Sequence, residues 1–171
     1  DYYALMRLPH ADNSDRCFPV LGGRGCPFAC TFCYRMIKGY RAHSIQRILE
    51  EVNILIKNYH ITYVDFADEL LMTDPDRPIQ IAKALKPLGI KWDCNGRLNY
   101  AKPEILKKMK ESGCVFINYG IESVDDEVLE RMNKKLRYDQ IIAGVEATLE
   151  AGISPGLNII WGNLGDTKDT L

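Results

Sequence analysis

The chain has 171 residues and a formal net charge of −1, from 22 Lys and Arg against 23 Asp and Glu. A balance so close to zero offers no general electrostatic reason to bind nucleic acid or an anionic membrane, because that affinity comes from accumulated positive charge. With 46% hydrophobic and 26% charged residues, the composition is typical of a globular domain and excludes a disordered or collagen-like chain. The length predicts one domain with a single core.

Cysteine usage narrows the class of protein further. The six cysteines include three within eight residues, at Cys26, Cys30 and Cys33. Clustered thiols in a chain long enough to build a core indicate metal or redox chemistry in a reducing compartment rather than a disulfide framework. The sequence has neither an apolar run near the ~20 residues of a membrane helix nor a signal peptide, so we expect a cytoplasmic protein without a membrane partner. Both ends resemble cuts in a longer protein.

Apolar runs predict five strands, at residues 18–21, 61–66, 90–95, 114–121 and 154–161. Each run is almost continuously apolar, as expected of parallel strands that are covered on both faces. Pro19 cannot donate a hydrogen bond to a neighbouring strand, which predicts that the first strand lies at an edge of the sheet. Cys94 and Cys114 fall inside strand runs, and we expect them to be packed thiols.

Helices are predicted between these strands. The first begins after Ser44, a candidate N-cap, and continues to about Tyr59 on apolar spacings of three and four residues. Later segments with the same periodicity end at Gly89, Gly113 and Gly152, and each glycine fits the left-handed C-terminal cap of a helix.

Alternating strands and helices leave two parallel architectures, a doubly wound open sheet or part of a barrel. Thiol or polar residues follow all five predicted strands, in the order of the cysteine triplet, Asp68 and Glu69, Asn95 and Arg97, Glu122, and Gly162 and Asn163. The carboxyl ends of barrel strands converge on one mouth that carries the chemistry. A doubly wound sheet concentrates its ligand at one switch point instead. The spread over five strands therefore favours a barrel.

The cysteine triplet predicts a site for a metal or a cluster. Cys26, Cys30 and Cys33 follow the first strand in a glycine-rich segment, at spacings that let one tight loop aim all three inward. A structural zinc ion almost always takes four ligands, so zinc would need a fourth from Cys17, His43 or elsewhere. The same thiols could hold an iron-sulfur cluster, which ordinarily takes four cysteines, and leave one iron open to an external ligand. Packed thiols are the remaining alternative.

The spacing of Cys26, Cys30 and Cys33, with Phe32 before the third cysteine, resembles the CxxxCxxC signature of the radical SAM superfamily. The resemblance continues in the family's order through residues 24–27, 66–69, 92–97, 120–123 and 156–162. It implies a partial parallel (β/α)6 barrel, in which residues 1–171 form a truncated core domain with about five βα units. The sixth strand would lie beyond Leu171, leaving the fifth strand as an exposed edge that could pair between chains.

The resemblance also implies cofactors. The three cysteines would ligate a [4Fe-4S] cluster, and S-adenosylmethionine (SAM) would bind the fourth iron through its amino and carboxylate groups. An electron from an external donor, passed through the cluster, would split a carbon–sulfur bond of SAM and give a 5′-deoxyadenosyl radical. That radical would take a hydrogen atom from an unknown small-molecule substrate. The subgroup that the chain resembles most carries a cobalamin-binding domain before this core, and that domain would lie outside these residues.

Several residues would contact SAM if the resemblance holds. Asp68 and Glu69 match the motif that holds the methionine ammonium, with Glu69 preferred, although a helix-capping acidic pair is an alternative. Arg97 would pair with the methionine carboxylate through its planar donor fork, and Asn95 would bond the same group. A surface salt bridge and a turn are the alternatives for these two residues. Glu122 would accept hydrogen bonds from the ribose hydroxyls.

The adenine contacts match the family pattern more loosely. Ile160, Trp161 and Gly162 would offer backbone contacts, although residues 163–167 replace the usual Pro-Gly-Glu-Thr stretch. Phe32 would supply backbone bonds to adenine or act as a core aromatic residue. Ser123 followed by Asp126 predicts a capping box for the next short helix. The three histidines share no spacing, and we expect surface or capping roles for them.

The resemblance predicts a radical SAM enzyme core, in a protein that performs cobalamin-assisted methyl transfer or a related reaction. A methylthiotransferase-like radical SAM enzyme without cobalamin is the alternative among enzymes, and a zinc-binding interaction module is the alternative outside them. Basic and aromatic residues are mixed at Tyr34, Arg35, Lys38, Tyr40 and Arg41, as they are in some nucleic-acid sites. A solvated loop that offsets the negative charge of the cluster explains them more simply, so no nucleic-acid partner is expected.

Overall fold

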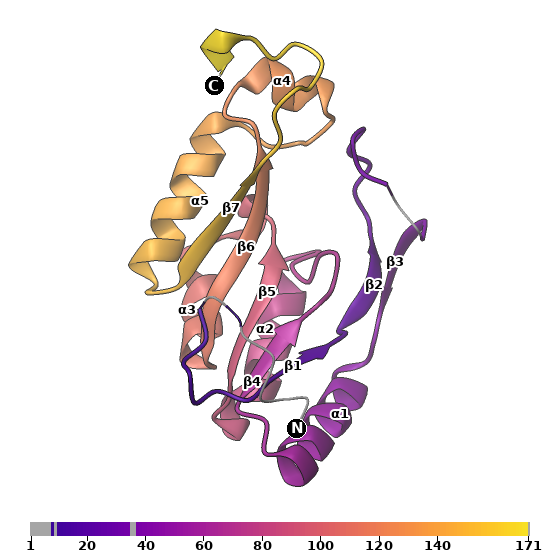
Figure 1. The fold of residues 1–171 in the computed structure, drawn as a ribbon, viewed down its shortest axis with the longest axis vertical. Coiled ribbons are helices and arrows are strands. Elements are labelled where there is room, and N and C mark those ends of the chain that lie inside the picture. Colours follow the sequence, from indigo (N-terminus) through magenta and orange to yellow (C-terminus); the bar gives the residue numbers. More distant parts are fainter. Residues whose placement is uncertain (1–7, 9, 35–36, 171) are drawn as a thin grey trace.

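In the computed structural model, which describes residue 8 and residues 10–34 and 37–170, five strands form one parallel sheet. They lie side by side in the order β1 (Cys17–Val20), β4 (Tyr63–Phe66), β5 (Lys91–Gly96), β6 (Cys114–Glu122) and β7 (Ser154–Ile159) (Figure 1). All five were predicted from the apolar runs. The predicted runs are longer than β4 and β7, so residues 61–62 and 160–161 lie outside the sheet.

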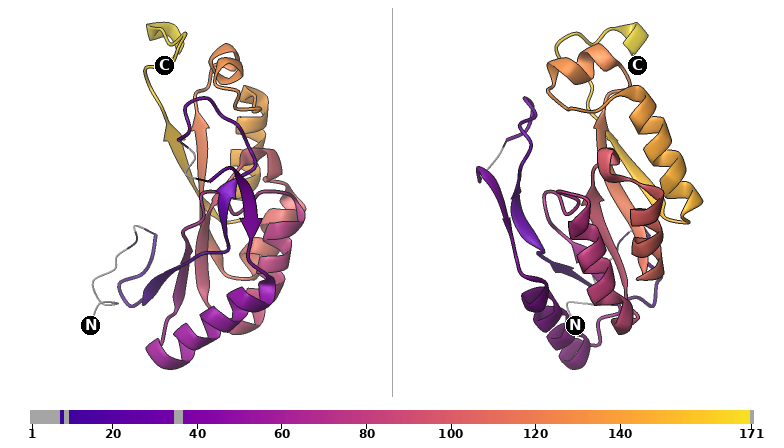
Figure 2. Two further views of the ribbon diagram at one scale, coloured as in Figure 1. Left: turned by 90° about the vertical axis from the view of Figure 1, so that its right-hand side faces the viewer. Right: turned by 180° about the vertical axis from the view of Figure 1, so that it is seen from behind.

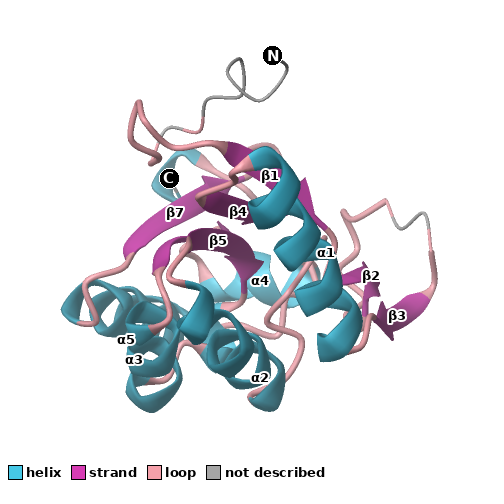
Figure 3. Ribbon diagram, turned by 90° about the horizontal axis from the view of Figure 1, so that it is seen from below, coloured by secondary structure: helices cyan, strands magenta, loops and turns pink. Residues whose placement is uncertain are grey.

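Four longer helices cover one face of this sheet (Figure 2 and Figure 3). They are α1 (Ile45–Tyr59), α2 (Asp76–Leu85), α3 (Pro103–Glu111) and α5 (Tyr138–Glu150), while the short α4 (Asp126–Arg131) follows β6. Single turns of 3-10 helix occur at Lys86–Leu88, Leu98–Tyr100 and Lys168–Thr170. The side chain of Ser44 accepts a hydrogen bond from the backbone nitrogen of Arg47, and Gly89, Gly113 and Gly152 have left-handed backbones, so the predicted caps are confirmed.

The strand order decides between the two predicted architectures. Each strand pairs with the next strand of the five, and the helices lie on one face, whereas a doubly wound sheet reverses its strand order and places helices on both faces. The sheet is therefore singly wound and barrel-like, and it is not closed. β1 and β7 form its edges, which confirms the edge positions predicted for Pro19 and for the fifth strand.

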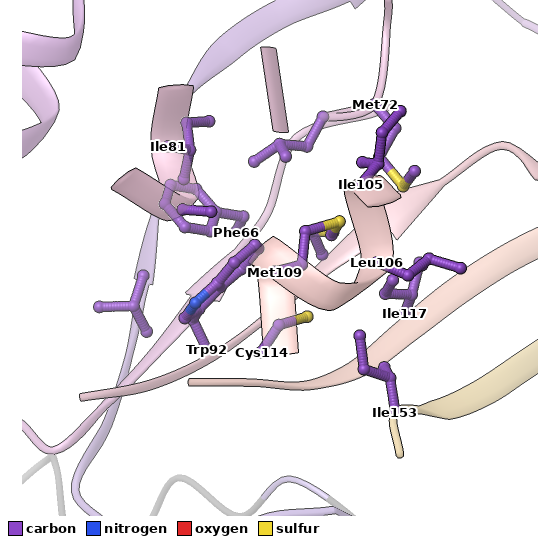
Figure 4. Packing of buried hydrophobic residues seen from close by; sticks show 14 of the residues in the cluster. Phe66, Met72, Ile81, Trp92, Ile105, Leu106, Met109, Cys114, Ile117 and Ile153 are labelled. Atoms are coloured by element: carbon purple, nitrogen blue, oxygen red, sulfur yellow. The ribbon is translucent and has the colours of Figure 1, made fainter. Parts of the chain in front are cut away.

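The core lies between the sheet and the helices (Figure 4). Phe66 of β4 and Trp92 of β5 meet edge to face, with ring centroids 5.8 Å apart, in the geometry that aromatic pairs prefer. Cys94 and Cys114 are buried in this core, as predicted for packed thiols. A hydrogen bond with Cys114 and burial both raise the pKa of the Cys94 thiol, which keeps it unreactive.

A second, two-stranded sheet was not predicted. β2 (Gly23–Cys26) and β3 (Gly39–Ala42) pair antiparallel, and Cys30 and Cys33 follow β2 in the segment between the two strands (Figure 1). We call residues 22–43, of which the structure describes all but 35–36, the cysteine hairpin. Gly25 has a φ of 82°, and a Cβ at this position would lie 2.2 Å from the carbonyl oxygen of Gly39. Only glycine permits this close approach of the two strands.

Residues 10–16 cross the face of the sheet that the helices leave open. The ring of His10 stacks on Phe116 of β6, with centroids 4.0 Å apart, and its Nε2 atom is hydrogen-bonded to Asp93 of β5. Tyr63 of β4 donates a hydrogen bond of 2.8 Å to the same carboxylate. Lys91 pairs with Asp15 at 3.0 Å. These contacts hold the segment against the amino-terminal half of the strands.

Two local expectations have different outcomes. The predicted capping box of Ser123 and Asp126 is wrong, because the N-cap of α4 is Asp125, whose carboxylate accepts a hydrogen bond of 2.9 Å from the nitrogen of Val128. Ser123 instead accepts a hydrogen bond from the nitrogen of Asp125. His60 caps α1 with a left-handed backbone, as expected of a capping histidine.

Among the described residues, no helix is both long and apolar enough to cross a membrane.

Candidate active site

A cavity of about 330 Å³ opens at the carboxyl ends of the strands. Most of the predicted site residues line it, namely Cys26, Cys30, Phe32, Cys33, Glu69, Asn95, Arg97 and Glu122. They come from the cysteine hairpin and from the ends of β4, β5 and β6, because parallel strands deliver their carboxyl ends to the same edge of a sheet. A larger groove of about 560 Å³ lies along α4 and the start of α5, but it is lined mainly by charged surface side chains and includes no predicted site residue.

The three cysteines all line this cavity. Cys30 is buried, Cys26 is half-buried and Cys33 is exposed. Burial raises the pKa of the Cys26 thiol, while the nearby Arg97 lowers it. In the part of the chain that the structure describes, no three acidic, cysteine or histidine side chains converge on a single metal position. In a [4Fe-4S] cluster each cysteine binds a different iron, so three thiols that line one cavity without meeting at a single point are compatible with such a cluster.

Asp68 and Glu69 are adjacent in sequence but face different surroundings. Glu69 is exposed and lines the cavity. Asp68 is 2% exposed, and its Oδ1 atom accepts a hydrogen bond of 2.6 Å from the backbone nitrogen of Gly22. Burial raises the pKa of Asp68 to about 6. The alternative that Asp68 caps a helix is therefore wrong, because its carboxylate binds the start of the cysteine hairpin.

Arg97 is buried at the cavity with part of its hydrogen-bonding capacity unused. Its guanidinium lies over the ring of Phe28, 3.8 Å from the centroid, and its Nε atom donates to Asn99 at 2.8 Å. Within the described residues, its Nη2 atom has no hydrogen-bond partner. A buried, unpaired guanidinium nitrogen is costly unless an acceptor fills the cavity beside it. Arg97 is 5% exposed, so the surface salt bridge considered for it is wrong.

Asn95 links the loop after β4 to strand β6 at the cavity. Its side-chain nitrogen donates to the carbonyl oxygen of Asp68 at 2.8 Å, and its side-chain oxygen accepts from Asn118 of β6 at 3.0 Å. Asn118 also lines the cavity, as does Asn158 of β7. Sequence reasoning missed these two residues, although both belong to strands whose carboxyl ends were expected to carry polar groups.

Glu122 forms a buried ion pair that was not foreseen. Its Oε1 atom lies 2.9 Å from Nζ of Lys134, and both side chains are less than a tenth exposed. Nζ of Lys134 also lies 5.6 Å from the centroid of the Phe32 ring. Glu122 ends β6 with a φ of 67°, a left-handed backbone that is strained for a residue other than glycine and occurs preferentially at functional sites. The sequence around Lys134 shows no periodic or spacing signal that would mark it.

The segment predicted to contact adenine lies beside the cavity rather than in its wall. Ile160 donates a backbone hydrogen bond of 3.0 Å to the carbonyl oxygen of Glu122. Trp161 is exposed, and the backbone nitrogen of Gly162 donates to the Asp166 carboxylate at 2.8 Å. Their contacts with adenine stay predictions. Phe32 does line the cavity and is 36% exposed, so it is not the core aromatic residue considered as an alternative.

The fold and the cavity together define a barrel-like α/β protein with a three-cysteine site at the carboxyl ends of its strands. A family model described as "Radical SAM superfamily" matches residues 20–171. The chain belongs to the radical SAM superfamily, a family of enzymes that use a [4Fe-4S] cluster and SAM, as the cysteine motif indicated.

Relatives of the chain within this superfamily include methyltransferases. The chain is 33% identical over 155 residues to "Uncharacterized methyltransferase PH0819" of Pyrococcus horikoshii, covering 88% of this chain and 34% of the relative. It is 28% identical over 140 residues to the bacteriochlorophyllide d C-12(1)-methyltransferase of Chlorobaculum tepidum, covering 78% of this chain and 31% of the relative. The chain thus spans about a third of the length of these relatives.

Solved structures share the fold. The methyltransferase TsrM from Kitasatospora setae, solved with cobalamin and a [4Fe-4S] cluster, superposes with a TM-score of 0.82 at 15% identity, covering 99% of this chain and 34% of TsrM. The cobalamin-dependent radical SAM enzyme OxsB, solved with aqua-cobalamin and SAM, gives a TM-score of 0.79 at 21% identity, covering 89% of this chain and 25% of OxsB. At these identities the likeness concerns the fold.

Proposed function

We propose that the chain is the core of a radical SAM methyltransferase that binds a [4Fe-4S] cluster through Cys26, Cys30 and Cys33. The observation that carries this proposal is one cavity that combines three thiols with the carboxylate of Glu69 and the unpaired Nη2 atom of Arg97. SAM has a matching set of groups, since its ammonium suits a carboxylate and its carboxylate suits a guanidinium. When bound, the cluster supplies one electron for cleavage of a carbon–sulfur bond of SAM.

The chain's own residues would orient the nucleotide. Glu69 would accept hydrogen bonds from the methionine ammonium, and Arg97 would donate to the methionine carboxylate, with its guanidinium already oriented by Phe28 and Asn99. Asn95 would contact the same end of SAM. The carboxylate of Glu122 would accept hydrogen bonds from the ribose hydroxyls.

The adenine would then lie towards Phe32 and the segment from Ile160 to Gly162. The backbone hydrogen bond between Ile160 and Glu122 supports this placement, because it ties that segment to the proposed ribose position.

Methyl transfer with cobalamin is the reaction that we propose for the whole protein. The support is that relatives named methyltransferases align with most of this chain and that TsrM and OxsB, both described with cobalamin, share its fold. The cobalamin would be bound by a domain outside these residues. Part of the site for the unknown small-molecule substrate would also lie outside them. An external electron donor would reduce the cluster. Six free thiols support a reducing compartment, and we propose the cytoplasm.

A methylthiotransferase is the second candidate function. It is favoured by a 31% identity over 137 residues to the ribosomal protein uS12 methylthiotransferase RimO of Bdellovibrio bacteriovorus, covering 68% of this chain. The two candidates differ in cobalamin, so binding of hydroxocobalamin by the full-length protein separates them.

Anaerobic reconstitution with iron and sulfide tests the shared core of both candidates. We expect roughly four irons and four sulfides per chain, and a reduced-cluster EPR spectrum that changes when SAM is added. A single tightly held zinc ion with thiolate and imidazole ligands would instead identify the chain as a zinc-binding interaction module.

A further inference from the structure

The cysteine hairpin stands apart from the main sheet. β2 and β3 pair with each other in a separate two-stranded sheet, and the hairpin extends beside the barrel-like sheet as a narrow ribbon (Figure 1). An isolated two-stranded hairpin is marginally stable in water. The position of the three cysteines therefore depends on what holds the hairpin to the rest of the fold.

The base of the hairpin is the point where Gly22 meets His43. The backbone nitrogen of His43 donates a hydrogen bond of 2.8 Å to the carbonyl oxygen of Gly22. Gly22 lies two residues after the end of β1, and His43 directly precedes Ser44, the N-cap of α1. The two ends of the hairpin are thus joined where they enter and leave the main fold.

Two buried charged side chains bind this base. The carboxylate of Asp68 accepts from the nitrogen of Gly22 at 2.6 Å. The Nη2 atom of Arg77 donates to the carbonyl oxygen of Gly22 at 2.7 Å and to that of His43 at 2.9 Å. The backbone N–H and C=O groups of Gly22 and His43 are therefore all hydrogen-bonded, by Asp68, by Arg77 or by each other.

The energetics indicate a role beyond general stability. Asp68 is 2% and Arg77 is 7% exposed, and burial raises the pKa of Asp68 to about 6, so its ionised form is disfavoured. Within the described residues, Oδ2 of Asp68 and Nε of Arg77 lack hydrogen-bond partners. Burying two charged side chains whose hydrogen bonds are only partly met is costly, so these contacts are weak evidence for a stabilising role. What Asp68 and Arg77 do provide is a fixed geometry for the hairpin base.

The loop between β4 and α2 connects this base with the cavity. Asp68 binds the hairpin, while its neighbour Glu69 lines the same cavity as the cysteines. Arg77 lies in the first turn of α2, where its backbone nitrogen donates to the Asp74 carboxylate at 2.9 Å. The same loop thus sets the hairpin base and the acidic wall of the cavity.

A second, independent attachment holds the loop that carries the cysteines. The nitrogen of Thr31 donates to the carbonyl oxygen of Met132 at 2.9 Å, and the side chain of Asn133 donates to the carbonyl oxygen of Ala29 at 2.9 Å. The hairpin is therefore held at two places. Loss of the base contacts should free the hairpin ends locally without detaching the cysteine loop entirely.

We propose that Asp68 and Arg77 are positioning residues that fix the base of the cysteine hairpin and thereby hold Cys26, Cys30 and Cys33 at the cavity. The link to cluster binding rests on the function proposed above, whereas the grip on the hairpin does not. Neither residue touches the cofactors in this arrangement, and both act through the backbone of Gly22 and His43.

Hydrogen exchange on the cofactor-free chain tests the grip directly. Asp68→Leu and Arg77→Met should each speed amide exchange in residues 22–43 by roughly tenfold or more, while the amides of β5 and β6 keep their protection. Asp68→Asn retains an acceptor oxygen, and Arg77→Lys retains a charged donor, so both should restore most of the protection. Asp76→Asn in the same helix turn and Arg47→Ala on α1 are exposed controls and should change nothing.

Iron retention then tests the consequence for the cysteines. After reconstitution, Asp68→Leu and Arg77→Met should lose iron to a chelator several times faster than the unchanged chain, and the conservative variants should lose it at nearly the original rate. If amide exchange in residues 22–43 is unchanged, or if it becomes equally faster in β5 and β6, the proposal that Asp68 and Arg77 fix the base of the hairpin is wrong. If the unchanged chain binds no iron but the variants alter hairpin exchange as expected, the proposed function is wrong. The role of Asp68 and Arg77 at the hairpin base is then still supported. Faster hairpin exchange with unchanged iron retention refutes the role in holding the cysteines.

Discussion

Lys134 reaches Glu122 from the turn after α4 and forms a 2.9 Å ion pair with it in a setting where both side chains are nearly inaccessible to solvent. The same turn holds the cysteine loop through Met132 and Asn133. One short segment therefore contacts both the proposed cluster site and the proposed ribose site. Because the pair is buried, its removal has consequences that an exposed pair would not have.

Lys134→Met should destabilise the fold by about 3 kcal/mol, since it leaves the carboxylate of Glu122 buried without its counter-charge. The measurement is the urea midpoint of the cofactor-free chain at neutral pH. Lys135→Met is the matched control. Because Lys135 is exposed, this substitution should change the free energy of unfolding by less than about 0.5 kcal/mol. Equal midpoints for the two variants would show that the ion pair carries no special weight.

Stability should rise as the pH falls from 7.5 to 5.5. Burial raises the pKa of Asp68 to about 6, and burial with the adjacent carboxyl of Asp93 raises the pKa of Asp65. A carboxyl group whose pKa is higher in the folded state binds protons more tightly there, so its contribution is present at low pH and is lost as the pH rises through the folded value. For Asp68 alone we expect a gain of roughly 1 kcal/mol over this interval.

Chemical denaturation at both pH values measures this effect. Asp65→Asn and Asp68→Asn should each flatten the dependence and should be more stable than the unchanged chain at pH 7.5. The pKa of Asp15 is lowered by its hydrogen bond with Lys91 against the opposing effect of burial, so its contribution is lost only below pH ~4, outside the interval. A stability that falls on acidification to pH 5.5 would contradict the raised values.

The two groups of thiols should respond differently to alanine. Cys26→Ala, Cys30→Ala or Cys33→Ala should abolish assembly of the cluster, because each removes one of its ligands. Cys94→Ala should leave iron binding intact and cost roughly 1 to 2 kcal/mol of stability, because it opens a small cavity in the core. Iron content and the urea midpoint, measured on the same samples, separate the two outcomes. Equal iron loss in all four variants would refute this division.

Arg97→Met should weaken SAM binding to the reconstituted chain by roughly tenfold or more, the effect of losing a charge-assisted hydrogen bond. Phe28→Leu should weaken it less, since it removes only the ring that orients the guanidinium. Equilibrium dialysis with SAM gives both dissociation constants, and the EPR spectrum without SAM checks that the cluster is intact. If SAM binds the Arg97→Met variant as tightly as the unchanged chain, the methionine carboxylate binds elsewhere.

The edge strand β7 should make the chain self-associate at high concentration. Its backbone has a neighbour on one side, and Leu157, Ile159 and Trp161 are exposed near it. Ile159→Lys should shift the elution volume in size-exclusion chromatography towards the monomer. The exposed substitution Ile54→Lys on α1 is the control for added charge. A monomeric unchanged chain at every concentration would refute this association.

The main sheet could be predicted from the sequence because each of its strands is a nearly continuous apolar run, although the helices cover only one face of the sheet and β7 is largely exposed. Runs such as residues 114–121 are apolar almost throughout, and the glycines that end the helices separate them clearly. The cysteine hairpin carried no such signal, since β2 and β3 are four residues each, rich in glycine and arginine, and largely outside the core. Its pairing depends on a close approach at Gly25 that no hydrophobic period records.

The candidate site divides along a similar line. Cys26, Cys30 and Cys33 are close in sequence, so a local motif brings them together. Lys134 reaches the cavity only because the turn after α4 folds back onto Glu122, and that contact depends on tertiary structure. The sequence favoured Glu69 over Asp68 for the cavity, but it could not show what Asp68 does instead, because that answer requires the position of Gly22.

The division of tasks between Asp68 and Glu69 makes the length of their loop as important as its composition. Inserting a residue between Asp68 and Glu69, or deleting one beside them, would move one of the two carboxylates away from its position at the nitrogen of Gly22 or at the cavity. Homologues that bind the nucleotide in this way should therefore keep the spacing between β4 and this acidic pair.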